Sequence, residues 1–197
     1  NINLDVQTGD LTINSGGSID VSEAGYDAGA TVGNGAGPGA GSSGSDLSGG
    51  GGAYGGDGGD SSDSQLGGSA YGSTTNPVQL GSSGGGHDIS ERGTESNEIG
   101  RGGGLAILDV TGTTTIDGSI LANGGTALNG VQDAAGGGSG GGINLTTGGL
   151  EGSGSVTANG GAGGDDSTDG GGGGGGRIAV KYTTGSTTNL TLQAFGA

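Results

Sequence analysis

An internal repeat with a step of 36 residues constrains this chain more than any other feature of its sequence. Residues 118–125 (GSILANGG) return as residues 154–161 (GSVTANGG), so that position 120 corresponds to position 156. The same step takes Gly112 to Gly148 and Ile107 to Ile143, and residues 146–148 (TTG) return after 37 residues as 183–185. A period of this length is typical of stacked units, none of which can bury its apolar face alone.

Short runs of alternating apolar and polar residues predict β-strands, and no stretch shows helical periodicity. The expected strands lie at 1–6, 11–13, 19–21, 106–110, 114–116, 119–121, 143–146, 155–157, 178–182 and 189–195. The predicted class is all-β, as a parallel β-helix-like stack of short strands joined by glycine-rich returns. The alternative is a β-sandwich with long glycine-rich loops.

The first unit matches the second, but with a large insertion between them. Residues 4–6 (LDV) correspond to 108–110, and residues 17–19 (GSI) correspond to 118–120. These offsets exceed one period, so we expect a single repeat-built β domain over residues 1–197 with a glycine-rich insertion over 25–104. Consecutive glycines in polyproline-II-like conformation satisfy their backbone groups only by bonding to neighbouring segments. Polyglycine-II packing of the insertion is therefore one expectation, and an irregular surface loop is the other.

The composition excludes several classes of protein. The 197 residues include 59 Gly, one Phe and four Tyr, without Trp, Met or Cys, so neither a conventional aromatic core nor a disulfide framework is expected. The formal net charge is −16 with only four Lys and Arg, which is incompatible with nucleic-acid binding. No apolar run is long enough for membrane insertion.

The sequence also contains a set of short motifs that occur together in one known group of proteins. They are residues 102–104 (GGG), 111–112 (TG), 122–125 (ANGG), 171–182 (GGGGGGRIAVKY), 69–73 (SAYGS) and 77–81 (PVQLG). In these motifs the chain resembles the glycine-rich repeat modules of very large bacterial and archaeal secreted surface proteins, which are adhesin-like. The resemblance implies a β-helix-like fold, a secreted or cell-surface location, an adhesive or structural role and no catalytic residues. A start at Asn1 instead of Met adds to the expectation of an exported protein.

Two acidic loops are candidates for calcium binding. Residues 55–63 begin like the calcium-binding nonapeptide Gly-Gly-x-Gly-x-Asp, and residues 165–169 form the second loop. Carboxylate oxygens are the hard ligands that Ca²⁺ takes, so calcium is the one cofactor expected. Solvated turns are the alternative, because Asp and Ser favour turns without any metal. The candidate ligands are Asp57, Asp60, Asp63, Asp165, Asp166 and Asp169.

Other motifs indicate modification or no function. Asn144 and Asn189 begin N-glycosylation sequons, Asn-Leu-Thr in both cases. The glycine runs lack the helix and the Lys-Ser/Thr of a phosphate-binding loop. His87, beside Asp88, has no nucleophile-elbow motif near it and is expected to be an exposed loop histidine. We therefore expect no enzymatic activity.

The two ends of the repeat array point to self-association. Both ends are predicted strands without a charged, helical or proline-rich cap, and an uncapped strand can pair with another chain. The residues expected to take part are Ile2, Leu4, Val6, Leu190, Leu192 and Phe195. The predicted function is an extracellular structural subunit that forms a filament or surface layer, with itself as its partner. The alternative is a monomeric adhesin, ice-binding or carbohydrate-binding module whose partners are surface glycans.

Overall fold

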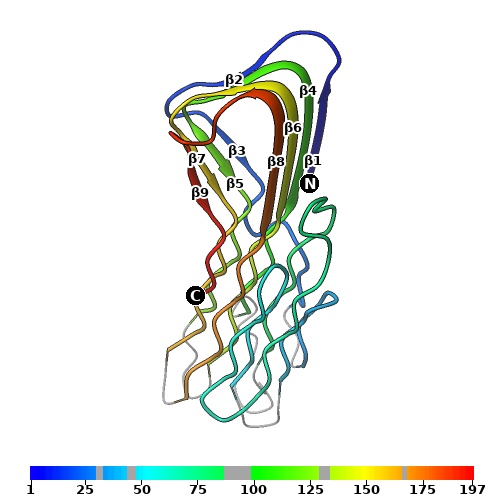
Figure 1. Ribbon diagram of the computed structural model, residues 1–197. Helices are drawn as coiled ribbons and strands as arrows, with labels where there is room; N and C mark the ends of the chain where they lie inside the picture. Colours follow the sequence, from blue (N-terminus) through cyan, green and yellow to red (C-terminus); the bar gives the residue numbers. More distant parts are fainter. Residues whose placement is uncertain (30–32, 44–47, 87–98, 129–133, 166–167) are drawn as a thin grey trace.

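The computed structural model describes residues 1–29, 33–43, 48–86, 99–128, 134–165 and 168–197. The described residues form nine β-strands and no α-helix, so the all-β expectation is confirmed (Figure 1). The strands are β1 (Ile2–Val6), β2 (Leu11–Ile13), β3 (Ser18–Asp20), β4 (Leu105–Ile116), β5 (Ser119–Leu121), β6 (Gly142–Glu151), β7 (Ser155–Thr157), β8 (Arg177–Gly185) and β9 (Thr191–Gln193).

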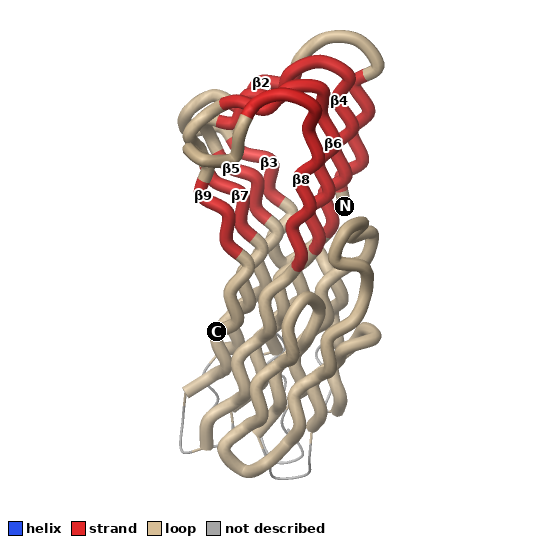
Figure 2. Tube along the Cα trace, viewed as in Figure 1, coloured by secondary structure: helices blue, strands red, loops and turns tan. Residues whose placement is uncertain are grey.

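The strands belong to two sheets, and every pairing is parallel. The first sheet has the order β1-β4-β6-β8, with β2 also paired to β4, and the second has the order β3-β5-β7-β9. The chain visits the two sheets in turn, so the strands stack as four layers (Figure 2). We number these layers one (β1–β3), two (β4, β5), three (β6, β7) and four (β8, β9).

The repeat step of 36 residues is confirmed in the second sheet, where Ile120 faces Val156. In the first sheet the register shifts between Val110 and Thr113. Before this shift the step is 37 residues, and Ala106, not Ile107, faces Ile143. The expected match of Ile107 with Ile143 is therefore wrong. Because successive residues of a strand point to opposite faces, a slip of one position would turn the apolar set outward.

Two expectations for the last layer are also wrong. Thr146 faces Lys181, so the recurrence of TTG at 183–185 does not mark the register between β6 and β8. The apolar pair Leu145 and Val180 sets that register instead, because it keeps both side chains on the inner face. The final strand is only Thr191–Gln193, and Asn189 lies in the turn before it.

The core consists of apolar columns that run through all four layers between the sheets. One column contains Leu4, Leu108, Leu145 and Val180. Leu108 and Leu145 in the middle layers are buried, whereas Leu4 and Val180 at the two ends are only partly buried. Each layer thus covers the apolar side chains of its neighbour, and the outermost layers have a neighbour on one side only.

The glycine-rich segments pack below the sheets through backbone hydrogen bonds that repeat every three residues (Figure 1). In segment 48–53 the N–H groups of Gly49 and Gly52 donate to Ala134 and Gly137, three residues apart. The N–H groups of Gly50 and Ala53 donate to Ser42 and Gly39, and that of Gly51 donates to Gly59. Three residues per turn is the period of a polyproline-II helix, in which no backbone group bonds within its own segment.

Segment 134–141 lies in the interior of this glycine-rich bundle and bonds to six other segments. It donates to segments 81–86, 122–127 and 170–176, and it accepts from segments 48–53, 100–104 and 158–164. Each of these contacts uses positions three residues apart, such as Gly136 to Gly85 and Ser139 to Ser82. Segments of the insertion and of the later returns therefore share one hydrogen-bonded bundle.

Close approach of these backbones explains why the bundle needs glycine. A Cβ atom at Gly51 would lie 1.9 Å from the carbonyl oxygen of Gly172, far inside the contact distance. At Gly56, at the margin of the bundle, the nearest atom to such a Cβ would be 3.7 Å away. Glycine is thus required in the interior and dispensable at this margin.

We expect Gly51→Ala to lower the free energy of unfolding by about 1–3 kcal/mol, the usual cost of overpacking an interior. Gly56→Ala is the matched control, and it should be neutral or raise stability by up to about 1 kcal/mol through a less flexible unfolded chain. Thermal or urea unfolding of both variants measures the difference. Equal stability of the two variants would contradict the packing described above.

Candidate functional site

The first acidic loop lies within the glycine-rich bundle, where its carboxylates accept backbone hydrogen bonds. Asp57 Oδ1 accepts from the N–H of Ala70 at 2.6 Å, and Asp60 Oδ1 accepts from that of Gly67 at 2.9 Å. The two acceptors, Asp57 and Asp60, are three residues apart, and so are the two donors, Ala70 and Gly67. The two segments therefore run in opposite directions. Asp63 accepts from the Ser48 N–H and from the Ser61 hydroxyl. The three carboxylates therefore join neighbouring segments.

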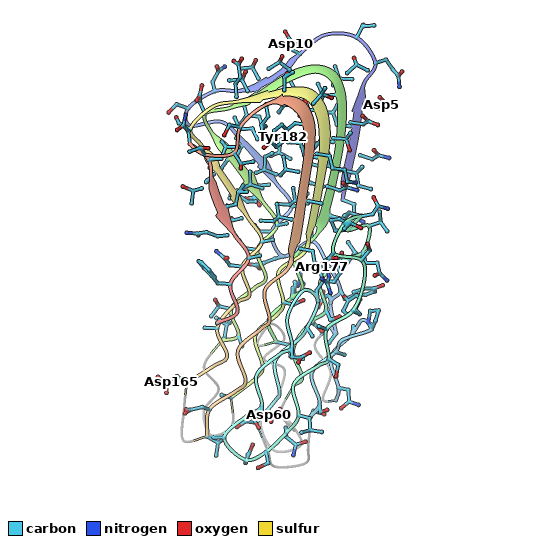
Figure 3. All side chains as sticks on the ribbon, in the orientation of Figure 1. Asp5, Asp10, Asp60, Asp165, Arg177 and Tyr182 are labelled. Carbon is cyan, nitrogen blue, oxygen red and sulfur yellow. The ribbon has the colours of Figure 1, made fainter. Side chains whose placement is uncertain are left out.

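The second acidic loop lies beside the first. The N–H of Ser62 donates to the Asp169 carbonyl oxygen, and the Asp169 N–H donates to the Ser62 hydroxyl at 2.8 Å. Asp165 is exposed near the same end of the bundle as Asp60 (Figure 3). Asp166 lies outside the described residues, as do His87 and Asp88. In the part of the chain that is described, no three His, Cys, Asp or Glu residues gather as metal ligands, and calcium binding stays a prediction.

The two sequon asparagines lie in different surroundings. Asn144 is 7% exposed, and its amide nitrogen donates to Asn76 Oδ1 at 2.9 Å. The segment that contains Asn76 belongs to the insertion and covers the outer face of β6 at this point. A glycan on Asn144 would have to displace this covering segment, whereas Asn189 is exposed in a turn and accessible to modification.

An aromatic cluster joins the insertion to the first sheet. The rings of Tyr54 and Tyr71 lie 4.9 Å apart, and the Arg177 guanidinium lies 5.6 Å from the Tyr54 ring centre. Arg177, at the start of β8, also donates from Nε to the Tyr71 carbonyl oxygen at 2.9 Å (Figure 3). The Tyr71 hydroxyl contacts the Leu80 carbonyl oxygen and the Ser82 hydroxyl. Burial raises the pKa of Tyr71 to about 12, and the hydrogen bond with Ser82 partly opposes this rise. Burial raises the pKa of Tyr54 as well.

A polar hollow of about 480 Å³ lies where the first layer meets the bundle. It is lined by Glu23, Asp27, Arg101, Thr126 and several other residues. Arg101 Nη2 pairs with Asp27 Oδ2 at 3.0 Å, so the charge of Arg101 is already neutralised. The described residues that line the hollow form no arrangement of acid, base and nucleophile of the kind found in catalytic sites.

The open end of layer four exposes apolar side chains of the stack. A hollow of about 400 Å³ lies between β8 and β9 and is lined by Ile178, Val180, Tyr182, Thr187, Leu192, Gln193 and Ala194. Tyr182 and Leu192 are 40% and 41% exposed. Val180 and Leu192 end apolar columns of the core, because Val180 follows Leu145 and Leu192 follows Val156.

The residues expected to mediate assembly lie at both ends of the stack. Ile2 and Leu4 are partly buried on layer one, opposite to the hollow. Leu192 lines the hollow, Leu190 is 9% exposed within the core, and Phe195 is 64% exposed beyond β9. Sequence reasoning missed Ile178, Val180 and Tyr182 as surface residues. Their alternation within the expected strand 178–182 could have identified them once that strand was placed in the last layer.

The glycine-rich bundle is open at the same end as layer four. Its hydrogen bonds run from layer to layer, from Gly103 to Ser139 and from Gly140 to Gly174. The next donor in this series is Gly175, and neither its N–H nor that of Gly172 has an acceptor among the described residues. Segment 170–176 therefore has hydrogen-bonding capacity left on the side that faces beyond the last layer.

We expect Asp60→Ala to destabilise the fold by about 1 kcal/mol because the Gly67 N–H loses its acceptor. Asp60→Asn keeps an oxygen at Oδ1 and should retain most of the stability. Thermal unfolding of the wild type and both variants, with calcium and with a chelator, distinguishes Asp60 as a hydrogen-bond acceptor from Asp60 as a calcium ligand. A calcium-dependent rise in melting temperature that is absent in both variants would instead make Asp60 a metal ligand.

The raised pKa of Tyr71 predicts a loss of stability in strong base. Because the unfolded side chain ionises near 10.0 and the folded one at about 12, this contribution is complete below pH 10 and is lost as the pH rises towards 12. Tyr71→Phe keeps the ring contact and should reduce this loss in urea unfolding at pH 10–12. Tyr54 leaves a residual pH dependence, and an unchanged profile in Tyr71→Phe would contradict the assignment.

Comparisons with known proteins show no family for this chain. No protein-family model matches it, and no curated protein and no solved structure does so either. None of the described residues belongs to a helix that could cross a membrane. The resemblance to glycine-rich surface-protein modules thus stays an expectation.

Proposed function

We propose that this chain is an extracellular structural subunit with a β-helix-like stack, which assembles head to tail into a filament or surface layer. The observation that carries the proposal is the apolar hollow at layer four. Three of its lining residues, Ile178, Val180 and Leu192, are the last members of core columns, so they have the spacing needed to pack against one more layer. The first layer of a second copy would supply this additional layer.

The columns of the core continue across such a contact. If layer one of the next copy follows layer four, Ile2 lies over Ile178, Leu4 over Val180 and Ile19 over Leu192, as the pairings within one chain extend. Edge strands β8 and β1 would then pair in parallel, as all strands of the first sheet do. Strand addition at a sheet edge supplies backbone hydrogen bonds, and burial of apolar area supplies about 25 cal/mol per Å².

The geometry of this contact favours an open polymer. Different surfaces meet at the two sides of the junction, so the contact is heterologous and does not close upon itself in pairs. The net charge of −16 opposes the approach of copies, and salt or divalent cations would weaken this repulsion. Assembly should therefore be faster at higher ionic strength or with calcium. Adhesion to surface glycans by a monomer is the alternative outcome of the experiment below.

We expect the purified chain to form filaments that light scattering and negative-stain electron microscopy detect. Leu192→Lys should prevent them, because a charge in the hollow must be desolvated when the next layer covers it. Val78→Lys, at a 51% exposed position of the insertion, changes the net charge equally and should leave assembly intact. Circular dichroism of both variants checks that the fold is kept. A wild-type chain that stays monomeric in physiological salt, with and without calcium, would overturn the proposal.

A further inference from the structure

One outward-facing column of the first sheet changes its charge from end to end. The pairings align Asp5 with Asp109, Asp109 with Thr146, and Thr146 with Lys181. Layer one thus begins the column with a carboxylate, and layer four ends it with the only lysine of the chain. Asp5 and Lys181 are both exposed, at opposite edges of the sheet.

Neither end of this column is neutralised by the part of the chain that the structure describes. Lys181 Nζ has an amide oxygen, Asn144 Oδ1, as its nearest partner at 3.4 Å, and no described carboxylate forms an ion pair with it. Asp5 accepts a hydrogen bond from Gln7 and lies beside Asp109, a like charge on the neighbouring strand. Like charges in directly opposed positions of a sheet are unfavourable. Among the described residues, no cation forms an ion pair with Asp5.

From this column we infer that Lys181 of one copy pairs with Asp5 of the next and thereby sets the register and polarity of the assembly. The inference rests on the head-to-tail contact proposed above. Extension of the parallel register by one layer places the two side chains in opposed positions on adjacent strands, within reach of an ion pair.

The neighbouring outward columns fit the same junction. Gln193 at the end of β9 would face Asp20, so an amide donor meets a carboxylate. Thr191 would face Ser18, in the column where Ser119 and Ser155 already share a hydrogen bond of 3.0 Å. These columns of the two sheets therefore bring no like charges together at the junction.

Other registers lose this complementarity. A shift of one residue would place Leu4 of the next copy opposite Ala179 or Lys181, so that inward-facing residues of one copy would meet outward-facing residues of the other. A shift of two residues keeps the apolar face inside but places Lys181 opposite Asn3 or Gln7, which are uncharged. Contact between two copies of layer one would bring Asp5 near a second acidic edge. The charged pair therefore selects one register and one direction.

Charge-reversal variants test the pair against general charge repulsion. Asp5→Lys reduces the net charge from −16 to about −14, which by general repulsion alone would strengthen assembly. The proposed pair predicts the opposite, because two lysines would then meet at the junction. Glu151→Lys, an exposed position on β6, makes the same charge change away from this column and is the matched control. Lys181→Asp and the double variant, Asp5→Lys with Lys181→Asp, complete the set.

We expect each single reversal to raise the critical concentration for assembly by about tenfold, since an attraction becomes a repulsion. The double variant restores an opposite pair at unchanged net charge and should return close to the wild-type value. Glu151→Lys should not weaken assembly. Sedimentation of polymer at a series of protein concentrations gives these values.

Two outcomes would overturn the inference, and they differ from a failure of the proposed function. If the wild type assembles but Asp5→Lys assembles as well as Glu151→Lys, the pair does not form. If the double variant stays as weak as the single variants, the two residues do not face each other. A wild type that never assembles refutes the head-to-tail contact itself.

Discussion

The structure depends on backbone hydrogen bonds between glycine-rich segments that approach each other more closely than any side chain permits. Segment 134–141 donates to three segments and accepts from three others, so its peptide groups are satisfied without a helix or a sheet. A conventional apolar core is small in this chain, which has one Phe, four Tyr and no Trp or Met. Backbone hydrogen bonds of the bundle therefore hold the part of the molecule that lacks apolar side chains in a defined structure.

The sheets and the bundle are two parts of one stacked architecture. Each layer of strands continues directly into a glycine-rich segment, as β6 follows segment 134–141 and β8 follows segment 170–176. The insertion between β3 and β4 adds further segments to the same bundle and is joined to the sheet by Tyr54, Tyr71 and Arg177. Because apolar columns and hydrogen bonds both run from layer to layer, the two parts end at the same face. That face is the one we propose for assembly.

The acidic residues have two kinds of position in this architecture. Asp57 and Asp60, which are exposed, use their carboxylates to accept backbone hydrogen bonds from a neighbouring segment of the bundle, where side-chain oxygens take the place of carbonyl acceptors. Asp5 and Asp109 lie in one outward column of the sheet, where their charge is unbalanced within the subunit. The first pair contributes to the fold, and the second column supplies the charge pattern for a directional contact.

The 36-residue repeat, the alternating strands and the offsets of 104 and 101 residues were sufficient to predict the all-β class and the pairing of residues 4–6 with 108–110. They did not predict the strand register of the first sheet beyond layer two, because the register shift between Val110 and Thr113 depends on which side chains face inward. The path of the insertion also depended on the tertiary structure. A glycine has no side chain to indicate its neighbours, so the sequence does not show which of many equivalent backbone segments it will bond.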